Sequence, residues 1–422
     1  MHKRKMKKID LDLYSKTLEN GMLINIIVKK DVKNVYATFT TRYGSFENNF
    51  IPIGEKKMFN APLGIAHFLE HKLFEQENGE EPFAFFTKNG ADSNAFTSYQ
   101  NTSYLFSGIG NLENNLNYLI DFVQNPCFTD ANVAKEKGII EQEIKMYDDV
   151  PFYKLFDRIM FNTFHDHPLK YPIIGTSESI NRITKEDLYK CYNTFYNPSN
   201  MFLTIVGDVE PESLIELIKN NQSKKEFSKS QKIVLDSQYE PDTVIKDYEE
   251  ITFDVELPKV GLVYKINTQG YEINKFQRYL EMYFQIKADV TSPLLEKLKE
   301  KLYMHDNISI FCIPAEKHIL CMLLFESSHY KKVLEELEKE ISSKDVDKKS
   351  LERKKKVAKS RYIYISEHVH GIGNKINDDI IHCGKVIVDE EKEIDSLNID
   401  EMNEILSKIH FDNKTIAVLK KE

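Results

Sequence analysis

Two histidines stand four residues apart in "HFLEH", His67 and His71, and Glu70 directly precedes the second one. A helix advances about 100° per residue, so both imidazoles would project from one face. Zinc binds histidine nitrogens readily, and a catalytic zinc site keeps one position open for water. Glu70 is placed to take a proton from that water. The HxxEH order therefore predicts a catalytic zinc centre with two histidine ligands and Glu70 as general base.

The third zinc ligand must come from elsewhere in the chain, and "EKGIIEQEIKMYDD" offers three glutamates. On a helix, Glu136 and Glu143 flank the apolar stripe on one side, whereas Glu141 turns toward solvent. An inward carboxylate is costly to bury unless it is paired or bound to a metal. We therefore predict Glu143 as the third ligand and Glu136 as the residue that orients the site.

The elements that carry these residues can be read from periodicity. Alternating apolar runs in "MLINIIVKK", "VYATFTTRYGSF" and "SNAFTSYQNTSYLFSGI" predict strands. Helical periodicity and N-cap residues predict helices over 63–75 and about 112–125, and a long helix that starts near Thr129-Asp130 and runs toward Asp148.

The chain also repeats its own plan. Residues 397–421 predict a capped helix, an asparagine turn and an apolar strand, in the same order as residues 183–208. A stretch rich in Lys, Ser and Gln, residues 223–239, separates the two copies. We expect a zinc-bearing domain over 1–222 and a domain of similar fold over 240–422, which lacks HxxEH and is therefore zinc-free.

Composition limits the other functions. The 422 residues carry a net charge of −9, which argues against a nucleic-acid partner. No run of 18 apolar residues occurs, so we expect no membrane span. The five cysteines are scattered and form no CxxC pair, which favours the reducing cytoplasm.

The zinc motif and its surroundings resemble the pitrilysin family of zinc peptidases, the inverzincins. "HFLEH" is followed 72 residues after its second histidine by Glu143, and "YGSF", "NAFTSYQNTSYLF" and "HPLKYPIIGTSESINRIT" also match. The resemblance implies an α+β fold of two homologous α/β halves. Each half is an antiparallel sheet backed by helices, and the two face each other around a chamber. The sequence of these motifs is similar to that of bacterial peptidases that act as pairs of subunits. Some of those peptidases process ribosomally made peptides.

The resemblance also implies how a peptide is held. An extended peptide would add to the sheet edge at "SNAFTS" through main-chain hydrogen bonds. Asn94 and Ala95 would hold its backbone, and Phe96 would line the pocket after the scissile bond. The alternative is that these are ordinary strand residues.

One part of the family pattern is missing. Family members complete the site with an Arg and a Tyr from the zinc-free half, but "SPLLEKLKEKLYMHD" has Lys299 at the arginine position and a displaced Tyr303. Lysine lacks the forked donors of arginine. We therefore expect a related zinc-free subunit to supply the pair in a heterodimer. A homodimer in which Lys299 and Tyr303 suffice is the alternative.

Together these features predict a zinc-dependent endopeptidase that cleaves short or unfolded peptides with one Zn²⁺ per chain. The alternative function is a non-catalytic peptide-binding or scaffold subunit of the same fold. Two other histidine pairs are not assigned to a metal site: His165 and His167 lie two apart on a turn, and His368 and His370 lie near a glycine break.

Overall fold

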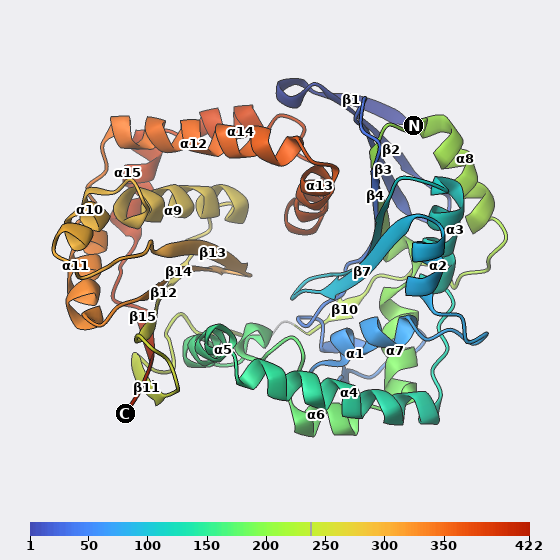
Figure 1. Cartoon of the computed structure of the whole chain (residues 1–422), viewed down its shortest axis with the longest axis horizontal. Coiled ribbons are helices and arrows are strands. Elements are labelled where there is room, and N and C mark those ends of the chain that lie inside the picture. The colour runs from blue at the N-terminus through green and yellow to red at the C-terminus, as the bar shows by residue number, and fades with distance from the viewer. Residues whose placement is uncertain (237–238) are drawn as a thin grey trace. The chain divides into compact units, whose positions relative to one another are not determined.

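The computed structural model describes residues 1–236 and 239–422, which form two compact units. The units are not contiguous halves of the chain (Figure 1). The first contains Met1–Ile144, Pro172–Ser237 and Tyr362–Asp389, and the second contains Lys145–Tyr171, Gln238–Arg361 and Glu390–Glu422. Each sequence half therefore places one helical segment in the unit formed mainly by the other half. The assignment of homologous domains to 1–222 and 240–422 remains a prediction, and residues 237 and 238 of the expected linker lie outside the described residues.

The first unit is built on a seven-stranded sheet with the order β1-β2-β3-β9-β4-β8-β7. Every pair of neighbours is antiparallel except β3 and β9, which run parallel. The sheet is thus antiparallel, as expected, except at this pair, because β9 returns to the sheet only after a long helical excursion. The strands are β1 (His2–Met6), β2 (Leu11–Thr17), β3 (Leu23–Val28), β4 (Val35–Thr41), β7 (Ala91–Thr97), β8 (Thr102–Gly108) and β9 (Met201–Gly207).

A small second sheet has the order β10-β5-β6, with β5 at Asn49–Ile51, β6 at Phe59–Asn60 and β10 at Val234–Leu235. Val234 pairs with Ile51. Part of the expected linker is therefore a strand of the first unit.

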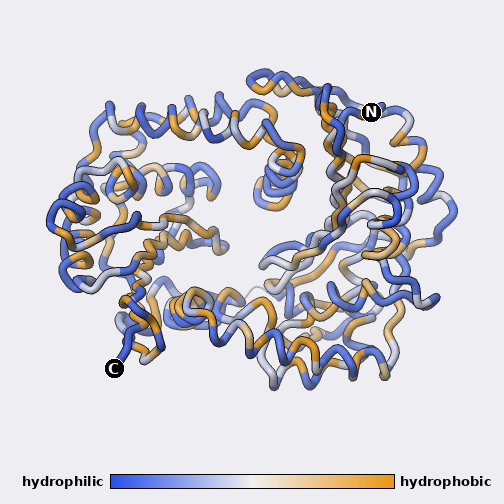
Figure 2. The backbone as a smooth tube through the Cα atoms, in the orientation of Figure 1, coloured by the Kyte–Doolittle hydropathy of each residue, from blue (hydrophilic) through white to orange (hydrophobic). Residues whose placement is uncertain are grey.

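Helices cover both faces of the large sheet. The helices α2, α3 and α8 contact β7, β8 and β3, whereas α13 contacts β9 and β4 on the other face. Hydrophobic residues lie both on the strands of the large sheet and on the helices beside it (Figure 2). The helices of this unit are α1 (Ile65–Leu73), α2 (Pro82–Lys88), α3 (Leu112–Val123), α6 (Ser177–Arg182), α7 (Lys185–Phe195), α8 (Pro211–Gln222) and α13 (Val369–Cys383).

The contact between α13 and the sheet is close enough to require a glycine. A Cβ on Gly373 would lie 2.5 Å from Cδ1 of Tyr36 in β4. Around this point the hydroxyl of Tyr36 donates to Oδ1 of Asn374 at 2.8 Å. Nδ2 of Asn377 donates to Oγ1 of Thr38 at 2.9 Å. Helix α13 is thus fixed to the sheet by packing and by buried polar contacts.

The second unit contains a five-stranded sheet with the order β11-β15-β12-β14-β13, in which only β11 and β15 run parallel. Two long helices, α4 (Asp130–Asp148) and α12 (Lys348–Ser366), begin in one unit and end in the other. The strands are β11 (Tyr248–Thr252), β12 (Lys259–Asn267), β13 (Ser309–Ala315), β14 (His318–Glu326) and β15 (Lys414–Lys420). The remaining helices are α5 (Pro151–Thr163), α9 (Ile273–Ala288), α10 (Pro293–Glu300), α11 (Tyr330–Ser342), α14 (Glu390–Ser396) and α15 (Ile399–Lys408). Short 3₁₀ helices lie at Lys7–Ile9, Pro168–Lys170 and Pro198–Asn200.

Helix α5 lies on this second sheet against β12 and β15. Here too the strand supplies a glycine, because a Cβ on Gly261 would lie 2.0 Å from Cδ1 of Ile159. The alternate residues of β12, Val260 and Leu262, belong to the core that includes Leu280 of α9. The helix and the α9 core therefore occupy opposite faces of the sheet.

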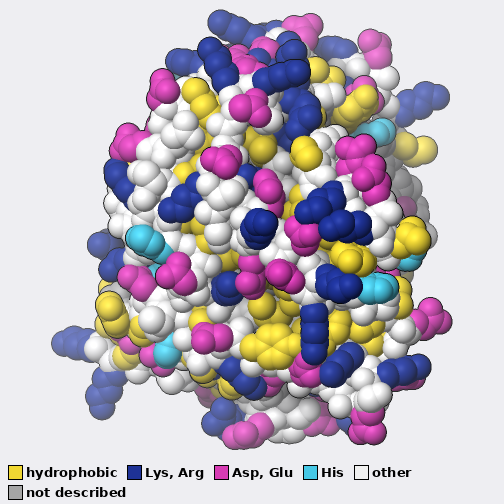
Figure 3. Space-filling view, turned by 90° about the vertical axis from the view of Figure 1, so that its left-hand side faces the viewer, with side chains coloured by type: hydrophobic (Ala, Val, Ile, Leu, Met, Phe, Trp, Pro, Cys, Tyr) yellow, Lys and Arg dark blue, Asp and Glu magenta, His cyan; other side chains and the backbone are white. Residues whose placement is uncertain are grey.

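The predicted fold class is confirmed: the protein is a mixed α+β protein with two halves of sheets and helices. The repeated helix–turn–strand order is also present, as α7 followed by β9 and as α15 followed by β15. In the described part of the chain, no helix is both long and apolar enough to cross a membrane. On the face seen in Figure 3, side chains of both signs lie intermixed.

An ion pair fixes α5 to the edge of the second sheet. Nε and Nη2 of Arg158 donate to the two carboxylate oxygens of Glu249 at 3.0 and 2.7 Å. Nδ2 of Asn162 adds a bond of 3.0 Å and Nζ of Lys246 one of 2.9 Å. Burial alone would raise the pKa of Glu249, but these donors outweigh it and lower the pKa to about 2.

This ion pair gives a pH-dependent prediction. A carboxyl group whose pKa is lower in the folded state stabilises the fold above its unfolded pKa, and that stability is lost as pH falls toward the folded pKa. Glu249→Gln should therefore lower the free energy of unfolding by about 2 kcal/mol at pH 7. The deficit relative to wild type should shrink as pH falls from about 4.5 toward 2. Denaturant unfolding across this range measures it, and a deficit that is independent of pH would contradict the assignment.

Candidate metal centre and active site

Helix α1 presents the HxxEH residues. It starts at Gly64, whose φ of +84° and whose contact with the carbonyl of Ile174 leave no room for a side chain. Ile65, Phe68 and Leu69 are buried and fix the helix against the core. His67 and His71 lie on another face, with ring centroids 4.5 Å apart. The apolar spacing of the helix thus sets the direction of both imidazoles.

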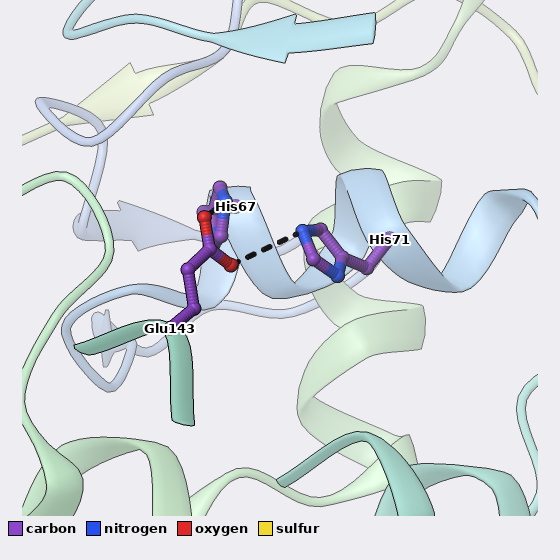
Figure 4. A group of neighbouring side chains, drawn as sticks. All are labelled: His67, His71 and Glu143. Carbon is purple, nitrogen blue, oxygen red and sulfur yellow. Dashed lines mark ion pairs between the residues drawn. The ribbon is translucent and has the colours of Figure 1, made fainter. Parts of the chain in front are cut away.

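Glu143 of α4 completes a group of three side chains that could hold a metal ion (Figure 4). Its Oε1 lies 3.8 Å from Nε2 of His67, and its Oε2 lies 3.7 Å from Nε2 of His71. One ligand atom from each residue lies within 4.8 Å of the others, and no other such group occurs among the residues that the structure describes. Tetrahedral zinc with bonds of about 2.0–2.1 Å separates its ligands by about 3.3–3.5 Å. Small side-chain movements would close this difference, so the residues fit a zinc ion.

Burial keeps the first imidazole in the form that binds metals. His67 has a side chain that is 13% exposed. Burial, together with the neighbouring His71, lowers the pKa of His67 to about 3. A neutral imidazole has a lone pair for a metal, and no proton has to be displaced near neutral pH.

Glu136 lies behind the second imidazole. Its Oε1 is 3.0 Å from Nδ1 of His71. Burial alone would lower the pKa of His71 and raise that of Glu136, but the contact between them reverses both directions. The ionised carboxylate can only accept, so Nδ1–H of His71 donates and Nε2 is left toward Glu143. This is the contact expected of a residue that orients a metal-binding histidine.

Glu70 is connected to the sheet by a residue that the sequence analysis did not single out. Oγ1 of Thr97, the last residue of β7, donates to Oε2 of Glu70 at 2.6 Å. Burial raises the pKa of Glu70, although the Thr97 bond opposes the rise. The sequence signal for Thr97 was a β-branched residue with a hydroxyl group directly after Asn94–Phe96. Its partner, Glu70, lies 27 residues away in the sequence.

The three predicted peptide-binding residues lie on β7, which is the last strand in the order of the large sheet. Asn94 and Phe96 are exposed and Ala95 is partly buried, so the strand alternates as an edge strand does. Oδ1 of Asn94 accepts the backbone N–H of Ala95 at 2.9 Å. These residues are therefore not core residues, and their role in binding stays a prediction.

Lys299 and Tyr303 belong to the second unit. Nζ of Lys299 donates to Oδ1 of Asn307 at 2.8 Å. The Tyr303 ring stacks on His329 with centroids 5.2 Å apart, and Nζ of Lys332 lies 4.9 Å from its centre. Both residues have partners inside their own unit, and their proposed role toward a substrate remains untested.

The other chemical candidates have structural partners. Nδ1 of His167 accepts the backbone N–H of Leu169, as expected for a loop residue. The ring of His370 packs edge-on against Tyr36. Glu141 accepts from Nδ2 of Asn181 and is not in the metal-binding group. Nζ of Lys359, a residue of α12, pairs with Oδ1 of Asp395 at 2.7 Å.

Comparisons with known proteins show which family the chain resembles. Residues 51–177 match the family model for insulinase (peptidase family M16), and residues 182–357 match the M16 inactive domain. The chain is 45% identical over 300 residues to the zinc protease YmfH of Bacillus subtilis, which covers 70% of each protein. It is 27% identical over 211 residues to a mitochondrial-processing peptidase subunit beta of Arabidopsis thaliana, which covers 48% of this chain and 37% of that one.

Among solved structures, an M16-like peptidase from Alicyclobacillus acidocaldarius superposes with a TM-score of 0.92 at 27% identity. The match covers 98% of this chain and 99% of the other. The predicted resemblance to the pitrilysin family is thereby confirmed: the chain belongs to the insulinase family of zinc peptidases, M16.

Proposed function

We propose that the chain is a zinc metalloendopeptidase that cleaves extended peptides held at the edge of its large sheet. The observation that carries this proposal is the bond of 2.6 Å from Thr97 to Glu70. It joins the general base on α1 to the edge strand β7, where a peptide would pair. Membership of a family of zinc proteases supports the same reading.

In the proposed reaction His67, His71 and Glu143 hold the metal. Zinc supplies Lewis-acid polarisation of the scissile carbonyl and lowers the pKa of water to about 7. Thr97 occupies Oε2 of Glu70, which leaves Oε1 as the oxygen that takes the proton of the attacking water. Glu70 then delivers this proton to the leaving amine. The raised pKa of Glu70 makes its carboxylate a stronger base.

A peptide must be extended to pair with β7, which favours short or unfolded chains as substrates. Asn94 and Ala95 would bind the peptide backbone, after the Asn94 side chain releases the N–H of Ala95. Phe96, which is 42% exposed, would line the pocket that follows the scissile bond. A precursor of a ribosomally made peptide meets these requirements. The dispersed cysteines favour the cytoplasm as the place of action.

The replacement Glu70→Gln tests the mechanism. The variant should keep its zinc, because the ligands are untouched, and should lose at least about a thousandfold in kcat/KM, because the amide cannot take a proton. Zinc content and cleavage of a mixed peptide library measure the two properties, with Glu77→Gln, an exposed glutamate, as control. Cleavage by Glu70→Gln at the wild-type rate would show that the mechanism is wrong.

A second function is a non-catalytic peptide-binding or scaffold subunit. The observation in its favour is Lys299 at the position where the family has an arginine, in a region matched by the inactive-domain model. A chain with this function would bind zinc and peptides, and it would cleave no peptide either alone or with a partner subunit.

The missing arginine leads us to propose a heterodimer with a related zinc-free chain. One oxyanion donor is worth about 3 kcal/mol, so the chain alone should cleave at least about a hundredfold more slowly than the pair. The experiment assays the chain alone and with the product of a related neighbouring gene, while mass is measured in solution. Full activity of the isolated chain at high dilution would contradict the heterodimer. Activity that rises with the concentration of this chain alone would point to the homodimer.

A further inference from the structure

A fully buried lysine lies directly behind the metal-binding residues. Lys72 follows His71 on α1, and its side chain has no exposed surface. Buried lysines are rare unless they are paired, because the charge loses its hydration. Its ammonium group lies 3.3 Å from Oε2 of Glu136 and also contacts Glu75, which is 41% exposed. The inward partner of Lys72 is thus the residue that contacts the metal-binding histidine.

The two oxygens of Glu136 have separate partners. Oε1 accepts Nδ1–H of His71 at 3.0 Å, and Oε2 accepts from Lys72 at 3.3 Å. Because a carboxylate is planar, fixing one oxygen fixes the direction of the other. Lys72 therefore determines which way Glu136 faces the imidazole.

Only one of the two imidazoles is anchored in this way. Nδ1 of His67 is buried and has no hydrogen-bond partner among the described residues. The orientation of the histidine pair consequently depends on the side-chain contacts that lead from Lys72 through Glu136 to His71.

We propose that Lys72 is a positioning residue of the metal centre. Its ammonium group holds Glu136 in the orientation that accepts Nδ1–H of His71, and so directs Nε2 of His71 toward the metal. This inference rests on the proposed function only in that His67, His71 and Glu143 bind a metal. It does not require peptide cleavage.

Lys72→Met removes the charge and keeps the length of the side chain. Loss of an orienting group typically weakens metal binding by about 10–100-fold, and we expect this loss here. Zinc affinity of the metal-stripped full chain is measured by competition with a chromophoric chelator. Lys72→Arg should restore affinity to within about threefold, since guanidinium also donates to a carboxylate. Titration with Co²⁺ provides a spectrum that should broaden in Lys72→Met and recover in Lys72→Arg.

The matched control is Lys354→Met. Lys354 is an equally buried lysine whose ammonium pairs with Asp289 and contacts Thr291, all in the second unit. The Lys354→Met variant should lower thermal stability as Lys72→Met does, and it should leave zinc affinity unchanged. If Lys72→Met does not fold, Lys72→Gln replaces it, with the same expected loss of affinity because the amide carries no charge.

The double variant Lys72→Met/Glu136→Gln distinguishes positioning from a general structural role. If Lys72 acts through Glu136, the double variant should bind zinc within about threefold of Glu136→Gln alone. Wild-type zinc affinity in Lys72→Met, or losses that multiply in the double variant, would overturn the proposal. A wild-type chain that binds no zinc would instead overturn the metal site itself. Intact zinc binding with no cleavage, either by the chain alone or with the related zinc-free chain, would overturn only the peptidase function.

Discussion

The candidate site depends on one constraint: α1 and α4 must lie so that a carboxylate of α4 reaches two imidazoles of α1. Glu143 spans the two Nε2 atoms at 3.8 and 3.7 Å. Glu136 lies seven residues earlier on the same helix, and its carboxylate contacts Nδ1 of His71. A spacing of seven is almost two full turns, so one packing contact positions both glutamates. A divalent cation would add the positive charge that this group of carboxylates needs.

The edge strand joins this centre to the substrate side of the chemistry. Thr97 ends β7 and donates to Glu70, so the position of the base is set relative to the strand on which a peptide would pair. Catalysis by positioned groups gains most when the reacting atoms need no further arrangement after binding. In the proposed reaction, the hydroxyl group of Thr97 therefore links the strand that binds the peptide to the residue that transfers the proton.

Local pattern was enough to predict α1, α4 and the repeated helix–turn–strand order, because each follows from periodicity and capping within about 25 residues. The parallel pair of β3 and β9 could not be predicted in this way, since its partners lie more than 170 residues apart. The placement of α5 and α13 in units formed mainly by the other half has the same cause. In the sequence, this placement is marked locally by a glycine where each helix packs closely on a sheet. These glycines are Gly261, which faces α5, and Gly373, which lies in α13.

Charged residues show the same limit at the site. Glu143 and Glu136 could be chosen from their helical angle, but Lys72 reads as a solvent-exposed lysine until Glu136, 64 residues away, is brought beside it. Lys354 and Lys355 lie in the basic run "LERKKKVAKSR" and are also buried, each with partners distant in the sequence. Sequence pattern identifies which groups can do chemistry, whereas their partners follow from the tertiary fold.

The central claim, that α1 and α4 together form a zinc centre, is tested most directly by the zinc content of the purified full chain. Atomic absorption should find one zinc per chain in the wild type and in Glu141→Gln, whose side chain lies outside the metal-binding group. Glu143→Gln should lose most of its zinc on dialysis, because an amide oxygen is a poor zinc ligand. Full zinc retention by Glu143→Gln, or no zinc in the wild type after loading, would contradict the account.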